Sequence, residues 1–418
     1  MRSGQDWRKF CPLLVVALLL AAVGAWVLAQ SSAAQQEAPR IVRGVVFDDA
    51  NGNGQRDAGE RGISGVVVSD QAAVAQTAAD GSYQFAATPE TALAFISLPD
   101  GWTAPRGFWQ PLKFAAAAAR ADFALRPRPR HSEFTFLHAS DTHLSPQSLP
   151  RLRRLREIVE RERPAFVLLT GDLVRDALRV PEEEARALYD LLAQELAQFP
   201  VPVWTVPGNH EIFGIERHLS LVSTQHPLYG KKMYRHYRGP NYFSFTWGGV
   251  HFMGLDTVDI DDLWYYGHLD AAQLAWLKND LAALPPATPV ATFNHIPLAT
   301  ATDALHGYRD EPPAPSLIRV AGKTQFRHVV SNTAELLLAL APHRLEIALG
   351  GHMHTPESIV YQSQTGPLRF HQAGAVVGSN TVAGIKIPSG VTLYRVRAGQ
   401  IDNGTFLPLD ASPAAAQP

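Results

Sequence analysis

The chain of 418 residues is poor in cysteine and has almost no excess of charge of either sign. Its one cysteine, Cys11, cannot form a disulfide within the chain, and a zinc site built on several thiolates is excluded. The 37 basic and 39 acidic side chains give a net charge of -2, so the basic excess of a typical nucleic-acid-binding protein is missing. A hydrophobic fraction of 46% excludes a disordered chain, and the length favours two or three domains. The 16 histidines, by contrast, are numerous.

The N-terminus combines basic residues with a long apolar run. Three basic side chains precede the run from Leu13 to Ala29. This order predicts a signal peptide over residues 1–29 and an exported protein, periplasmic or extracellular. The run also approaches the ~20 residues of a membrane-spanning helix, so an uncleaved membrane anchor is the alternative. Cleavage before Gln30 removes the single cysteine.

The chain between residues 30 and 132 divides into a polar linker, a β-rich region and a second linker. Residues 30–40 are polar and rich in alanine. From 41 to 126, short alternating runs separated by Gly, Asp and Pro predict a small antiparallel β-sandwich. The alternating prolines of the linker 127–132 favour an extended, stiff connector.

One loop of the β-rich region has the spacing of a calcium-binding loop. Oxygen-bearing side chains occupy positions one, three, five, nine and twelve, and Gly54 occupies position six, where an EF-hand loop turns sharply. An Asn-Gly-rich hairpin loop without calcium is the alternative. With the runs ISGVVVSD and AADGSYQF, this stretch resembles B-type repeat and transthyretin-like domains of secreted bacterial proteins, which implies a spacer module. The candidate calcium ligands are Asp49, Asn51, Asn53, Asp57 and Glu60.

The second region, residues 133–408, alternates strands and helices, and residues 409–418 form an Ala/Pro-rich tail that we expect to be disordered. Helices are expected over 150–163, 181–198, 270–284 and 332–342. The pattern predicts an α/β layered domain with the strands at its centre.

Five predicted strands of this region end in residues that bind metals. Open α/β sheets place their sites outside the carboxyl ends of strands, so these loops can meet at one place. Any one of these motifs is weak evidence for a metal site, but the ordered occurrence of five such motifs at strand ends is very unlikely by chance. Imidazole and carboxylate ligands without thiolate suit zinc, manganese or iron. The motifs are Asp141 and His143, Asp172, Asn209 with His210 and Glu211, His295, and His352 and His354.

In this order, D-x-H, G-D, G-N-H-E, N-H and G-H-x-H, the chain resembles the calcineurin-like metallophosphoesterase superfamily. The resemblance implies two central sheets flanked by helices and a binuclear metal site. One metal is then held by the residues at 141, 143 and 354 and the other by those at 209, 295 and 352, while Asp172 bridges both. His210 is not a ligand in this scheme but contacts the phosphoryl group.

This resemblance predicts a phosphohydrolase acting on a small phosphomonoester or phosphodiester. A metal-bridging hydroxide attacks phosphorus in line, and His210, steered by Glu211, assists the leaving group. The alternative is a non-catalytic binding or adhesion protein on a phosphoesterase scaffold, whose mark would be a lost ligand. No ligand position is lost in this sequence.

Three residues are candidate substrate contacts. Arg175 follows the motif of Asp172, and Tyr308 and Arg309 lie in the long connection 299–329. Long connections in compact domains are often functional, although solvated surface charge is the simpler explanation of such residues. The aromatic run 264–266 fits either stacking on a substrate or packing inside the domain.

Overall fold

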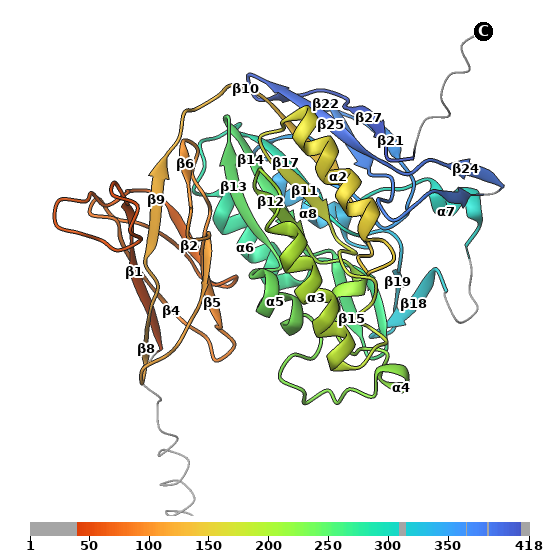
Figure 1. The fold of residues 1–418 in the computed structure, drawn as a ribbon, viewed down its shortest axis with the longest axis horizontal. Helices are drawn as coiled ribbons and strands as arrows, with labels where there is room; N and C mark the ends of the chain where they lie inside the picture. Colours follow the sequence, from red (N-terminus) through yellow and green to blue (C-terminus); the bar gives the residue numbers. More distant parts are fainter. Residues whose placement is uncertain (1–39, 309–314, 365, 383, 411–418) are drawn as a thin grey trace, which may run out of the picture.

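The computed structural model describes residues 40–308, 315–364, 366–382 and 384–410. The chain forms a β-rich region that ends at Pro127 and an α/β region that begins at Glu133 (Figure 1). The predicted signal peptide, the linker up to residue 39 and the tail from 411 lie outside the described residues. Within the described ranges, no helix is long and apolar enough to cross a membrane.

The β-rich region is a sandwich of two small sheets. The first has the order β4 (Ser82–Ala86), β1 (Ile41–Asp48), β9 (Phe123–Pro127) and β6 (Trp102–Thr103), with β8 (Ala118–Arg120) also paired to β1. The second has the order β3 (Val74–Gln76), β2 (Val67–Ser69), β5 (Leu93–Ile96) and β7 (Trp109–Pro111). The prediction of antiparallel pairing throughout is wrong, because β1 pairs in parallel with β8 and β9. Between β1 and β8 the chain passes through strands of both sheets, and such a long connection permits parallel pairing.

The α/β region contains two larger mixed sheets. The first has the order β12 (Val203–Val206), β11 (Val167–Thr170), β10 (Glu133–Ala139), β25 (Gly390–Arg397) and β26 (Gln400–Ile401), with β27 (Thr405–Pro408) paired to β25. The second has the order β13 (Phe243–Trp247), β14 (Val250–Leu255), β17 (Pro289–Asn294), β20 (Arg344–Gly350), β22 (Gly366–Gln372) and β21 (Glu357–Ser363). The strands β10, β11 and β12 are parallel to one another, and so are β14, β17 and β20.

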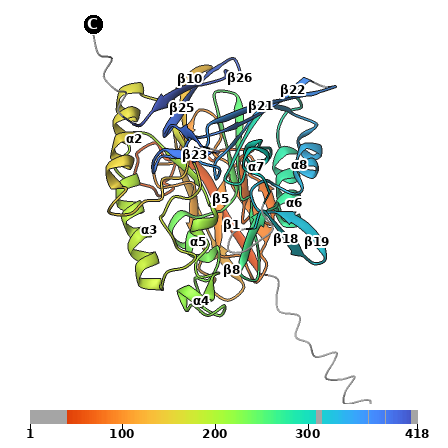
Figure 2. The same ribbon diagram turned by 90° about the vertical axis from the view of Figure 1, so that its right-hand side faces the viewer.

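The two large sheets pack against each other and carry helices on their outer faces (Figure 2). Phe136, Phe166 and Phe252 join the sheets, with ring centroids 5.1–5.4 Å apart. Helices α2 (Leu149–Glu162) and α3 (Glu182–Leu196) bury their apolar faces on the first sheet. Helices α6 (Ala271–Leu281) and α8 (Thr333–Leu340) cover the second. The predicted layered sandwich of two sheets flanked by helices is thereby confirmed.

Local chemistry explains where several of these elements begin and turn. The carboxylate of Asp270 accepts a hydrogen bond of 2.7 Å from the Gln273 amide, so it caps α6 as the sequence predicts. The predicted β13–β14 hairpin turns at Gly248 and Gly249, whose φ angles of 57° and 80° favour glycine.

The long connection 299–329 contains structure that the sequence analysis did not predict. Helix α7 (Thr302–His306) is followed by the hairpin β18 (Leu317–Val320) and β19 (Lys323–Phe326). Other short elements are α4 (Arg217–Ser220), α5 (Lys232–Arg238), β15 (Val258–Asp261), β16 (Trp264–Gly267), β23 (Asn380–Val382) and β24 (Ile385–Ile387). The sequence does not predict them, because strands of three or four residues show no clear alternation and helices of four to seven residues are too short to show a helical period.

The β-rich region packs directly on the edge strand β13 of the α/β region. The Thr246 amide donates a hydrogen bond of 2.8 Å to the Leu98 carbonyl, and the Tyr242 hydroxyl donates one of 2.7 Å to the Gln71 carbonyl. The Phe108 ring lies 5.0 Å from that of Trp204. These contacts cover an edge that would otherwise expose unpaired backbone groups and apolar rings.

The linker 127–132 also takes part in this junction. The Arg128 guanidinium forms an ion pair of 2.9 Å with Asp100 and lies 3.5 Å from the ring centroid of Trp247. Arg128 therefore ties the linker to the β-rich region through Asp100 and to the α/β region through Trp247, in addition to any stiffness from the prolines.

Candidate metal centre

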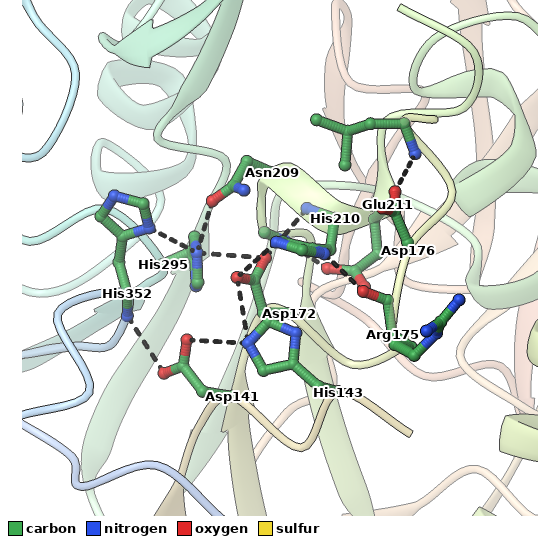
Figure 3. A network of polar contacts seen from close by, with 12 residues as sticks. Asp141, His143, Asp172, Arg175, Asp176, Asn209, His210, Glu211, His295 and His352 are labelled. Carbon is green, nitrogen blue, oxygen red and sulfur yellow. Dashed lines mark hydrogen bonds and ion pairs between the residues drawn. The ribbon is translucent and has the colours of Figure 1, made fainter. Parts of the chain in front are cut away.

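The predicted metal ligands follow the carboxyl ends of five strands from the two facing sheets. Strands β10, β11 and β12 end shortly before Asp141, Asp172 and Asn209. Strands β17 and β20, from the other sheet, end immediately before His295 and two residues before His352. Because the two sheets face each other, their strand ends bring these loops together, as Figure 3 shows.

One cluster consists of Asp141, His143, Asp172 and His354, whose candidate ligand atoms all lie within 4.8 Å of one another. Nε2 of His354 lies 3.1 Å from both Asp141 Oδ1 and His143 Nε2. Asp141 Oδ1 is buried and accepts no hydrogen bond. A buried carboxylate oxygen is costly without a partner, and a cation among these atoms would supply one.

A second cluster surrounds Nε2 of His295. Asp172 Oδ1, Asn209 Oδ1 and His352 Nδ1 lie 3.2, 3.1 and 3.1 Å from this nitrogen. The Nδ1–H of His295 donates to the Thr170 carbonyl at 2.8 Å, so Nε2 is the ring nitrogen left to face the other ligand atoms. Several lone pairs aimed at one place suit a bound cation.

Asp172 belongs to both clusters, with one carboxylate oxygen toward each (Figure 3). Oδ1 faces His295, and Oδ2 lies 3.6 Å from Nε2 of His143. Burial acts to raise the pKa of Asp172, but the surrounding histidines, His295 foremost, hold it well below its usual value. Burial also opposes a charge on His295, yet the Asp172 carboxylate raises its pKa to about 9. A proton here occupies the place that a metal would take, so the residues fit a pair of ions bridged by Asp172.

The backbone of the ligand loops is strained. A positive φ is uncommon for residues with a Cβ and costs of order 1–3 kcal/mol each. Such strain concentrates at functional sites, where the surrounding structure holds it in place. The ligands with positive φ are Asp141 (55°), His143 (37°), Asp172 (49°), His352 (72°) and His354 (54°).

Two glycines leave room for these loops. A Cβ at Gly351 would lie 1.9 Å from Ser140 Oγ, and one at Gly208 would lie 2.3 Å from Asp172 Oδ1. Larger residues at either position would displace the neighbouring ligand loop.

His210 is held by a main-chain carbonyl and not by Glu211. Nδ1 of His210 lies 2.5 Å from the Arg175 carbonyl oxygen, and Nε2 lies 3.9 Å from Asp172 Oδ2. The Glu211 carboxylate is fully buried and accepts hydrogen bonds from the amides of Leu173, Val174 and Gly208 at 2.6–3.0 Å. The prediction that Glu211 steers His210 is therefore wrong. Glu211 fixes the loops after β11 and β12 instead.

Neither Arg175 nor Tyr308, two of the candidate substrate contacts, is buried in the structure. The Arg175 side chain points away from the metal cluster in Figure 3 and pairs with Glu184 at 3.2 Å. Tyr308 is exposed, and Arg309 lies outside the described residues. Tyr265 and Tyr266 are buried, which favours packing over stacking for this run.

All five candidate ligands of the predicted calcium loop form hydrogen bonds within the loop. Asp49 accepts bonds from the amides of Gly52 and Gly54, and the side-chain amides of Asn51 and Asn53 both donate to Asp57 at 2.7 Å. Glu60 accepts bonds from the amides of Ala50 and Asp57. Within the described part of the chain, the clusters of three or more acidic or imidazole groups lie at the metal centre and not in this loop. Calcium binding stays a prediction.

A histidine outside the sequence motifs also reaches the centre. Nδ1 of His328 lies 2.8 Å from Nε2 of His352. The local sequence around His328 has no metal-binding pattern, so only the fold reveals this contact.

Comparison with known proteins decides the family. A profile described as calcineurin-like phosphoesterase matches residues 134–356, and one described as the N terminal of calcineurin-like phosphoesterase matches residues 50–128. The chain belongs to the calcineurin-like phosphoesterase family. The chain is 27% identical over 244 residues to a probable cyclic nucleotide phosphodiesterase of Rhodococcus erythropolis, and this match covers 54% of the chain and 66% of the relative.

Other similarities are more distant or shorter. An uncharacterized metallophosphoesterase of Aquifex aeolicus is 32% identical over 98 residues, which cover 22% of this chain and 34% of the relative. The chain thus spans less than two thirds of either curated relative. A solved dimetal phosphatase from Danio rerio aligns with a TM-score of 0.41 and 16% identity, over 67% of this chain and 99% of that one.

Proposed function

We propose that this protein is an exported two-metal phosphohydrolase that cleaves a small phosphomonoester or phosphodiester. The observation that carries the proposal is the pair of ligand clusters that share Asp172, with His210 beside them. Bound zinc, manganese or iron would lower the pKa of a bound water and neutralise charge on the phosphoryl group. Asp141, His143, Asp172 and His354 would hold one ion, and Asp172, Asn209, His295 and His352 the other.

His210 has the geometry of the general acid in this proposal. Its Nδ1–H donates to the Arg175 carbonyl, which fixes the ring so that Nε2 faces the metal cluster. A proton on Nε2 can pass to the oxygen of the leaving group, and the Arg175 carbonyl stabilises the charged ring before transfer. Positioned proton transfer of this kind contributes roughly 10²–10⁴-fold to the rate.

The test is a substrate panel with the purified protein loaded with zinc, manganese or iron. The panel contains monoesters, diesters and nucleotides, and cyclic nucleotides come first because the Rhodococcus relative is named a probable cyclic nucleotide phosphodiesterase. We expect turnover that His210→Gln lowers by roughly 10²–10⁴-fold without loss of bound metal. Loss of metal from His210→Gln would refute its assigned role. No turnover of any ester by metal-loaded protein would favour the non-catalytic alternative.

Export is supported by the basic and apolar N-terminal pattern of residues 1–29. Cell fractionation and mass spectrometry of the N-terminus test it. A mature chain beginning at Gln30 outside the cytoplasm is the expected result. An intact Met1 in the membrane fraction would identify an anchor, and an intact chain in the cytoplasm would contradict export.

A further inference from the structure

His328 makes a side-chain contact with a metal ligand although it lies outside every ligand motif. Its Nδ1 is 2.8 Å from Nε2 of His352, and the two rings lie 5.1 Å apart with an interplanar angle of 23°. The other nitrogen of His352, Nδ1, lies 3.1 Å from Nε2 of His295, inside the second ligand cluster. His328 therefore contacts His352 on the side opposite to the cluster.

If His352 binds a metal through Nδ1, the hydrogen bond between His352 and His328 can run in only one direction. A metal takes a lone pair on Nδ1, so the neutral ring must carry its proton on Nε2. That proton points at His328, whose Nδ1 must then accept it. The neighbouring ligand His295 is fixed in the same way, but by the main-chain carbonyl of Thr170.

The segment that carries His328 is itself well anchored. The Arg327 amide donates to the Ser316 carbonyl at 2.9 Å, and the Val330 amide donates to the Pro297 carbonyl at 2.9 Å. The Arg327 guanidinium is buried and donates to the carbonyls of Pro315 and Tyr265. The connection 299–329, in which the sequence places two candidate substrate contacts, thus holds a side chain that reaches His352.

Tyr265 restrains His352 from another direction. Its ring is nearly perpendicular to that of His352, at an interplanar angle of 89° and a centroid distance of 5.9 Å. The ring of His352 is therefore bounded by Tyr265, by His295 and by the hydrogen bond to His328.

We propose that His328 is a positioning residue that fixes the tautomer and orientation of His352 for the metal shared with His295 and Asp172. The inference rests on the two-metal site of the proposed function. Partners that orient metal-binding histidines in this way typically change metal affinity by 10–100-fold when they are removed. We expect a loss of that size only for the metal held with His352 and His295. His328 contacts His352, whereas His143 and His354, which belong only to the other cluster, contact each other.

The experiment measures metal affinity and not only activity. His328→Leu removes the acceptor at similar volume, whereas His328→Asn places an amide oxygen near the position of Nδ1. The exposed His236→Asn is the control for a histidine change remote from the site. Competition with a chelator and elemental analysis give the affinity and number of bound ions, and the spectrum of cobalt-substituted protein reports the ligand field.

The expected result is that His328→Leu binds one ion as the wild type does and the second 10–100-fold more weakly, with an altered cobalt spectrum. His328→Asn should restore most of the affinity, which a merely structural role would not require. Two ions held by His328→Leu with wild-type affinity would overturn the positioning role while leaving the proposed function intact. A wild-type protein that binds no metal would instead overturn the proposed function.

Discussion

His138 makes the free energy of unfolding of this protein depend on pH, because its side chain is buried in the folded state. The side chain is fully buried in β10, and its Nδ1 has no hydrogen-bond partner. Burial, followed by the neighbouring His371, lowers the pKa of His138 from 6.5 to about 3. The folded state therefore keeps this ring neutral at pH values where the unfolded chain protonates it.

The sign and size of the effect follow from this difference. Below the unfolded pKa of 6.5, protonation favours the unfolded chain, so the stability falls as pH falls until the folded pKa near 3. The slope for one group is about 1.4 kcal/mol per pH unit once the unfolded chain is protonated, so His138 alone costs roughly 3 kcal/mol between pH 7.5 and 4.5. Above pH 7 the contribution does not change with pH.

His138→Phe tests the calculation, because it keeps a ring beside Tyr394 but cannot titrate. Urea unfolding at pH 7.5 and 4.5 gives the free energy of unfolding of each protein at identical metal loading, so that metal release contributes equally to both. We expect the wild type to lose roughly 3 kcal/mol more than His138→Phe between these pH values. The pH-independent cost of the substitution cancels in this difference. Equal losses in both proteins would show that His138 is not held neutral.

Three further perturbations have definite expected outcomes. Deletion of 41–126 should give insoluble or aggregated protein, because it uncovers the edge strand β13 and Trp204. A soluble fragment that is folded by circular dichroism would contradict this expectation. Arg175→Ala should change kcat less than threefold in a hydrolysis assay, because its carbonyl and not its guanidinium holds His210; a loss as large as that of His210→Gln would contradict this. Gly351→Ala should lower both the melting temperature and the metal content measured by elemental analysis, because its Cβ would lie 1.9 Å from Ser140 Oγ. Unchanged values of both would show that the loop adapts freely.

The sequence predicts which side chains meet in the two clusters, because each motif is local and follows a strand. Once β10, β11, β12, β17 and β20 lie in two facing sheets, their ends must meet, and no long-range information is needed to find the ligands. The layered fold is predictable for the same reason, since helices and strands alternate with clear periods.

What the sequence could not supply depends on contacts between distant segments. Glu211 stands next to His210 in sequence, yet its carboxylate meets the amides of Leu173 and Val174, which only the fold brings near. The role of Arg175 resides in its carbonyl, which side-chain chemistry does not reveal. His328 lies in a connection with no motif. Parallel pairing of β1 likewise requires a crossover that local alternation does not encode.

The most direct test of the two-metal centre is the metal content and magnetic coupling of manganese-loaded protein, compared for the wild type and Asp172→Asn. The exposed Asp190→Asn on α3 is the matched control. Because one oxygen of Asp172 faces each cluster, we predict two ions per chain with a coupled electron paramagnetic resonance signal in the wild type and the control. Asp172→Asn should lose at least one ion and the coupling. Two coupled ions retained in Asp172→Asn, or a single ion in the wild type, would contradict the bridged centre.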